Sequence, residues 1–179
     1  MSEEEDEVLF GRYRQGDMRA FDCLYARYRQ SLFLYLLRTF GSRSEAEDLY
    51  HDCWSRVISA SEPFTQGLFR AYLFKIARHL SIDHQRKQRL RVVGSEDSLA
   101  AEATAPSAEK VHHDQTCQQQ LLAAIKDLPQ LQRDVFLLKE ESNLTLEAIA
   151  SLLAVGRETI KSRLRYAMQQ LREKLQECL

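Results

Sequence analysis

Apolar side chains recur at intervals of three and four residues along most of the chain, and this spacing is the strongest constraint on its fold. The interval matches the turn of an α-helix and differs from the alternation that is typical of a strand. Only six glycines and three prolines interrupt the 179 residues, so long helices can form. The sequence therefore predicts an all-α protein.

Capping residues and turn formers divide this pattern into successive helices. A short acidic helix is expected over about 3–14. Asp17 is a suitable N-cap for the next helix, and Gly41 is suited to the position just after its end. Pro63 and Gly67 make 59–67 a loop. The further expected helices cover about 45–60, 68–89, 118–127, 129–139, 146–153 and 157–175.

Residues 92–117 differ in character from the rest of the chain. They include many small residues, Pro106 and five acids against one lysine. Such a composition is typical of a flexible linker. We therefore expect two small helical domains, residues 1–91 and 118–179, joined by a flexible acidic linker.

The four cysteines are widely spaced and include no C-x-x-C pair. This spacing favours free thiols over a zinc site or a disulfide framework. His79, Asp83 and His84 lie close together, but no further ligand is spaced to complete a metal site. The cysteines are Cys23, Cys53, Cys117 and Cys178.

The chain shows no apolar run of the length that a transmembrane helix needs. Its first residues are acidic, whereas a secretory signal peptide begins with basic residues. We therefore expect the protein in the cytoplasm.

Basic side chains are concentrated in two segments although the net charge is −1. Residues 69–91 hold seven bases against one acid, and residues 157–174 hold six bases against two acids. Concentrated lysine and arginine favour a polyanionic partner because they release counterions from phosphates. Two ordinary solvated helix faces are the alternative interpretation.

Residues 145–165, TLEAIASLLAVGRETIKSRLR, have the pattern of a helix-turn-helix. Thr145 can cap the first helix, and Ile160 is expected on the buried face of the second. Ala154 stands where such motifs usually have glycine, so it must adopt a left-handed conformation or the turn must differ.

The outer face of the second helix in this motif is suited to a DNA major groove. An ordinary helical hairpin with a charged surface is the alternative. The expected DNA contacts are Arg157, Glu158, Lys161, Ser162 and Arg165.

Three segments resemble the sigma factors of bacterial RNA polymerase. AEDLYHDCWSRV (46–57) resembles the helix that docks on the polymerase clamp, and FRAYLFKIARHLSIDHQRKQR (69–89) is similar to the promoter-melting helix. Residues 128–175 are similar to the C-terminal promoter-reading domain. With AFDCLYARY (20–28), the resemblance covers most of the chain except the linker, and it points to the extracytoplasmic-function (ECF) group.

The resemblance implies two further sets of functional residues. It places 61–67 where relatives capture a flipped base. His51 and Asp52 stand where relatives tend to have Gln and Glu. A position in the protein core is the alternative for Trp54. The implied polymerase-binding residues are Asp48, Leu49, Asp52, Trp54 and Arg56. The implied contacts to the downstream promoter element are Arg70, Tyr72, Lys75, Arg78, Arg86 and Lys87.

The resemblance also implies the partners, which are core RNA polymerase, promoter DNA and an anti-sigma factor. It implies neither catalytic residues nor a cofactor. A stand-alone helix-turn-helix regulator is the alternative from another class, and a helical adaptor is a further one. Both basic segments and the motif argue against the adaptor.

Overall fold

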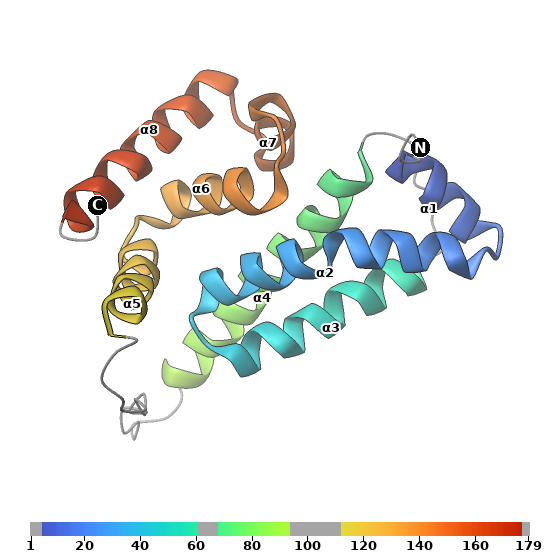
Figure 1. The fold of residues 1–179 in the computed structure, drawn as a ribbon, viewed down its shortest axis with the longest axis horizontal. Coiled ribbons are helices and arrows are strands. Elements are labelled where there is room, and N and C mark those ends of the chain that lie inside the picture. Colours follow the sequence, from blue (N-terminus) through green and yellow to red (C-terminus); the bar gives the residue numbers. More distant parts are fainter. Residues whose placement is uncertain (1–4, 61–67, 94–111, 177–179) are drawn as a thin grey trace.

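The computed structural model describes residues 5–60, 68–93 and 112–176, and this part of the chain is helical with no strand (Figure 1). The all-α prediction is confirmed. The expected loop at 61–67 and most of the expected linker lie outside the described residues. The helices are α1 (Asp6–Arg14), α2 (Met18–Phe40), α3 (Arg43–Ser59), α4 (Phe69–Val93), α5 (His112–Lys126), α6 (Gln130–Ser142), α7 (Leu146–Leu153) and α8 (Arg157–Lys174).

Several helix ends follow the signals in the sequence. The Asp17 carboxylate accepts a hydrogen bond of 3.0 Å from the Arg19 N–H, as expected of an N-cap. Gly41 has φ 72°, the left-handed conformation that ends many helices. The helices beside the expected linker extend further than predicted, since α4 continues to Val93 and α5 begins at His112. Neither end has a strong capping signal in the sequence.

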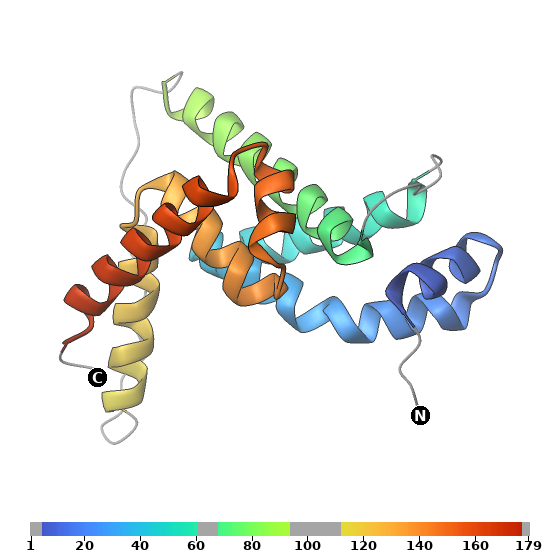
Figure 2. The same ribbon diagram turned by 90° about the horizontal axis from the view of Figure 1, so that it is seen from above.

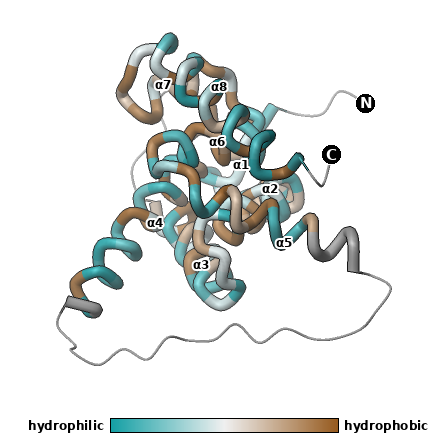
Figure 3. The backbone as a smooth tube through the Cα atoms, turned by 90° about the vertical axis from the view of Figure 1, so that its left-hand side faces the viewer, coloured by the Kyte–Doolittle hydropathy of each residue, from teal (hydrophilic) through white to brown (hydrophobic). Residues whose placement is uncertain are grey.

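α2 is the central helix of the first group and packs against α1, α3 and α4 (Figure 2). Leu24, Leu32 and Leu36 of α2 are fully buried. In α4, Phe69, Leu73, Ala77 and Leu80 are buried, while Ile76 is half-buried. Each helix contains both hydrophobic and hydrophilic residues, as amphipathic packing requires (Figure 3).

α6 joins the two groups of helices. Its residues 135–138 are all buried, and four successive positions of a helix point to all sides. The helix contacts α7 and α8 of its own group as well as α2 and α4 of the other. The buried apolar residues of both groups consequently form one continuous cluster.

Two ion pairs flank this junction. One joins Arg38 of α2 to Glu141 of α6. The other joins Arg78 of α4 to Asp134 of α6 at 3.3 Å. Burial raises the pKa of both Asp134 and Glu141 although each faces an arginine. Desolvation therefore outweighs the attraction of the partner in both pairs.

The cysteines agree only partly with the expectation of free thiols. Cys23 is exposed and Cys53 is buried, and both are free. Cys117 forms a disulfide, so the expectation is wrong there. Sequence spacing reveals only pairs that are close along the chain, whereas a disulfide requires two cysteines that are close in the fold. Cys178 lies outside the described residues.

No helix in the described part of the chain combines the length and the apolar character needed to cross a membrane. Within the same residues, no three His, Cys, Asp or Glu side chains are grouped so that they could hold a metal ion.

Candidate nucleic-acid interface

α7 and α8 form the helix-turn-helix that the sequence predicts. The Thr145 hydroxyl accepts a hydrogen bond of 3.2 Å from the Ala148 N–H and so caps α7. Ala154 has φ 54° and ψ 43°, so an alanine occupies the left-handed turn position. The Val155 N–H donates to the Ala150 carbonyl at 3.1 Å, which closes the turn. Ile160 of α8 is fully buried, as predicted.

The predicted DNA-reading residues lie on the first turns of α8. Arg157, Glu158, Lys161 and Arg165 are exposed, and Ser162 is half-buried. The structure thus brings all five onto one accessible part of the helix.

Several of these side chains interact with neighbours at the protein surface. Lys161 donates to Glu158 at 2.9 Å, and this hydrogen bond lowers the pKa of the Glu158 carboxyl. Arg157 pairs with Glu147 at the start of α7. The Arg165 guanidinium lies 5.2 Å from the centre of the Tyr166 ring. Exposed pairs of this kind are weak, so the cations can exchange these partners for phosphate or base edges.

The predicted melting residues of α4 fall into two groups. Lys75, Arg86 and Lys87 are exposed. Of these, Arg86 lies 3.7 Å from the Asp83 carboxylate. These cations are available to a DNA backbone along the length of α4.

Arg70, Tyr72 and Arg78 are half-buried and held by the protein itself. Arg70 donates from Nε to the Tyr28 hydroxyl at 3.1 Å. Arg78 pairs with Asp134, and its Nε is buried with no hydrogen-bond partner among the described residues. Arg78 must leave α6 before it can contact DNA.

The predicted polymerase-binding residues of α3 also divide into two groups. Asp48, Asp52 and Arg56 are exposed and form a charged stripe, as their spacing predicts. Leu49 and Trp54 are 3% and 5% exposed, so they belong to the core. In this arrangement of the helices they support α3 from the core, and their contact with the polymerase stays a prediction.

Aromatic packing explains the burial of Trp54. Its ring lies 5.0 Å from that of Tyr25 and 5.6 Å from that of Phe21, both on α2. Trp54 thus fixes α3 against α2 and supports the exposed stripe from behind.

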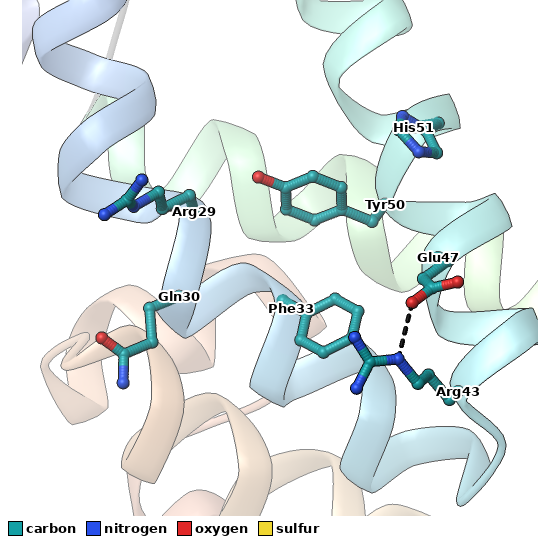
Figure 4. Close-up of a pocket in the computed structure, with 7 residues that line it drawn as sticks. All are labelled: Arg29, Gln30, Phe33, Arg43, Glu47, Tyr50 and His51. Carbon is teal, nitrogen blue, oxygen red and sulfur yellow. Dashed lines mark hydrogen bonds and ion pairs between the residues drawn. The ribbon is translucent and has the colours of Figure 1, made fainter.

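A surface hollow of about 540 Å³ lies between α2 and α3 (Figure 4). α3 also carries the charged stripe. Arg43 donates to Glu47 at 2.7 Å, and its guanidinium lies 5.9 Å from the centre of the Phe33 ring. The lining residues are Arg29, Gln30, Phe33, Arg43, Glu47, Tyr50 and His51.

Sequence reasoning noted only His51 among these lining residues. Arg29 and Phe33 come from α2, and their approach to α3 depends on how the two helices cross. No local pattern marks such a site. Arg43 is paired with Glu47, while Arg29 and His51 lie beside two aromatic rings, so the hollow suits a ligand with both acidic and apolar groups.

Comparison with known proteins decides the family. The family models described as "Sigma-70 region 2" and "Sigma-70, region 4" match residues 24–91 and 124–173. The ECF RNA polymerase sigma factor SigL of Mycobacterium tuberculosis is 33% identical over 159 residues, which cover 87% of this chain and 88% of SigL. The chain belongs to the ECF RNA polymerase sigma factors.

Other ECF sigma factors show similar relationships. SigW of Bacillus subtilis is 27% identical over 178 residues, which cover 92% of this chain and 93% of SigW. SigE of Mycolicibacterium smegmatis is 29% identical over 163 residues, and the match covers 90% of this chain but 63% of SigE.

Two solved structures share the fold. RpoE of Bartonella quintana, in complex with the anti-sigma factor NepR, has a TM-score of 0.66 at 24% identity, covering 87% of this chain and 96% of RpoE. CnrH, in complex with the cytosolic domain of CnrY, has a TM-score of 0.64 at 20% identity, covering 97% of this chain and 99% of CnrH. The region 2 match spans α2–α4 and the region 4 match reaches from the end of α5 into α8.

Proposed function

We propose that this ECF sigma factor binds core RNA polymerase in the cytoplasm and directs it to promoters. The observation that carries the proposal is a complete helix-turn-helix with an exposed basic face, joined in one chain to a region 2 match. A stand-alone regulator would account for the first feature and leave the second unexplained. The protein contributes binding free energy to initiation and no chemical step of its own.

The proposal assigns a task to each helical group. α8 would read the upstream promoter element through Arg157, Glu158, Lys161, Ser162 and Arg165. The basic face of α4 would bind the downstream element and stabilise the separated strands, where cations follow the backbone and aromatic rings stack on bases. Residues 1–91 and 118–179 would form the two functional units.

The exposed stripe of α3 would dock on the polymerase, with the neighbouring hollow receiving an acidic or apolar side chain. Asp48, Asp52 and Arg56 supply charges of both signs, which suits a charged partner helix. Leu49 and Trp54 would act indirectly, by holding α3 in place.

An anti-sigma factor would control the protein. RpoE was solved with the anti-sigma factor NepR bound. CnrH was solved with the cytosolic domain of CnrY bound. The similar fold supports an inhibitor of the same kind for this chain.

Charge reversal on α3 tests the proposal. We expect Asp52→Arg to weaken binding to core polymerase at least about tenfold, equivalent to about 1.4 kcal/mol, because repulsion replaces attraction. Fluorescence anisotropy of the labelled full-length protein titrated with core polymerase measures the affinity. Glu5→Arg, the same charge change at an exposed position of the α1 N-cap, is the control. Equal affinities for both variants would remove Asp52 from the polymerase surface.

A further inference from the structure

α1 holds both ends of the connection between α3 and α4. At one end, the Arg14 guanidinium donates a hydrogen bond to the carbonyl of Ala60, which directly follows α3. At the other end, the Glu7 carboxylate accepts a hydrogen bond of 2.9 Å from the N–H of Phe69, the first residue of α4. Figures 1 and 2 both show α1 at the end of the bundle where α3 ends and α4 begins.

The Glu7 contact acts as a cap that comes from a distant part of the chain. The first N–H groups of a helix have no partner within it, and the positive end of the helix dipole favours an anion. Here the anion lies 62 residues before the helix that it caps. The contact therefore fixes where α4 begins relative to α1.

A second set of contacts reaches the side chains of the first turn of α4. The Tyr28 hydroxyl donates to the Asp6 carboxylate and accepts from Arg70 Nε at 3.1 Å. The Arg70 guanidinium also lies 5.6 Å from the centre of the Tyr28 ring. Burial raises the pKa of Tyr28 to about 12, so the hydroxyl keeps the proton that it donates. Asp6 thus restrains Arg70 through Tyr28.

Aromatic packing adds to these polar contacts. Phe10 of α1 is 2% exposed, and its ring lies 4.9 Å from that of Phe69 and 6.0 Å from that of Tyr72. Both residues that the proposed function assigns to DNA in this turn, Arg70 and Tyr72, are therefore held in place by α1 or its direct contacts. The region 2 match begins at residue 24 and does not include α1.

We propose that α1 is a positioning element for promoter opening, with Glu7 and Arg14 as positioning residues that fix the start of α4 against the end of α3. This inference rests on the proposed function of α4. Residues held in one orientation before binding lose less entropy when they capture a separated DNA strand, and this gain limits the rate only where the duplex must first be melted. α1 should thus favour strand opening and leave the affinity for polymerase unchanged.

The test compares opening of a duplex promoter with binding to the same promoter already unpaired. Polymerase holoenzyme is assembled with the full-length protein and a promoter mapped by transcription. The fluorescence of 2-aminopurine in the downstream element reports opening. We expect Glu7→Ala and Arg14→Ala each to slow duplex opening about tenfold. On the unpaired template, the rate of transcription by each variant should stay within about threefold of wild type.

Matched variants separate positioning from a general effect of charge. Glu5→Ala and Arg19→Ala remove the same charges at exposed positions that contact neither end of the connection, and they should open the duplex at the wild-type rate. Glu7→Gln keeps an acceptor oxygen and Arg14→Lys keeps a cation, so both should recover part of the loss. If an alanine variant does not fold, these milder changes carry the same comparison.

Two results would overturn the inference. One is wild-type duplex opening by Glu7→Ala and Arg14→Ala. The other is an equal loss on the duplex and the unpaired template, which indicates a general structural defect. A wild-type protein that supports no opening on any promoter would instead contradict the proposed function, before any variant is compared.

Discussion

Lys161 and Arg165 are exposed four residues apart on α8, so both can face the same stretch of DNA. Lys161 now pairs with Glu158, and Arg165 lies over Tyr166. Both interactions are at the surface and are weak enough to be replaced by phosphate or a guanine edge. Neither side chain has a buried structural task, so their removal should affect DNA binding and spare the fold.

We expect Lys161→Ala and Arg165→Ala each to weaken binding of the upstream element by about 1–3 kcal/mol if the residue reads a base. A phosphate contact would instead weaken binding to all sequences. It would also lower the slope of the logarithm of the binding constant against the logarithm of salt concentration by about one. Footprinting of holoenzyme at several salt concentrations distinguishes the two cases. Lys126→Ala removes an exposed charge from α5 as the control. An unchanged footprint for both α8 variants would contradict the assigned DNA-reading face.

At the scale of the element, local signals explain the helix ends that could be predicted. Asp17, Gly41 and Thr145 each perform the expected capping task, and Ala154 adopts the left-handed conformation that its place in the motif requires. The start of α5 at His112 differs from the prediction because acidic and small residues just before it resemble a linker. Capping depends on neighbours in sequence, which is why it can be read from the chain alone.

The turn of the helix-turn-helix contains strain that a glycine would relieve. A left-handed conformation costs alanine roughly 1–2 kcal/mol, part of which glycine loses again through its greater freedom in the unfolded chain. We therefore expect Ala154→Gly to raise the free energy of unfolding by about 0.5–1 kcal/mol. Thermal and chemical unfolding measure the change. Ala123→Gly, in the exposed interior of α5, should lower stability by about 1 kcal/mol. A destabilising Ala154→Gly would show that the turn gains nothing from glycine.

At the scale of the whole molecule, the contacts between the two helical groups could not be predicted from sequence. The ion pairs Arg38–Glu141 and Arg78–Asp134 join residues 103 and 56 positions apart. No periodic pattern links such residues. The burial of residues 135–138 of α6 is equally non-local, and so is the position of α1 beside the end of α3 and the start of α4. The spacing along α3 predicts the exposed charges of the candidate site, but it does not fix the burial of Leu49 and Trp54, which depends on how α2 and α3 cross.

The junction between the groups should respond to pH in a defined direction. Burial raises the pKa of Asp134 in the folded protein, against the opposing effects of Arg78, Arg133 and Arg163. A raised carboxyl pKa contributes stability that is fully present below the ordinary value and is lost as pH rises through the raised value. Asp134 should therefore favour the folded state more in mild acid than at neutral pH.

Comparison with Asp134→Asn isolates this contribution from other titrating groups. Asparagine matches the neutral carboxyl in size, so the variant keeps the packing and loses only the titration. We expect the wild type to gain stability relative to the variant when pH falls from about 7 to about 4.5, as measured by denaturant unfolding at both values. A relative loss of wild-type stability over the same interval would mean that the arginines outweigh burial and that the pKa of Asp134 is lowered.

Transcription by core RNA polymerase, with and without the purified full-length protein, is the most direct test of the proposed function. The template is a library of genomic fragments from the organism that encodes the chain, and sequencing of the transcripts maps their start sites. We predict discrete start sites that appear only when the protein is present and that share upstream and downstream elements. If core polymerase gains no new start site and does not bind the protein, the assignment as an initiation factor is contradicted and DNA binding without polymerase becomes the better explanation.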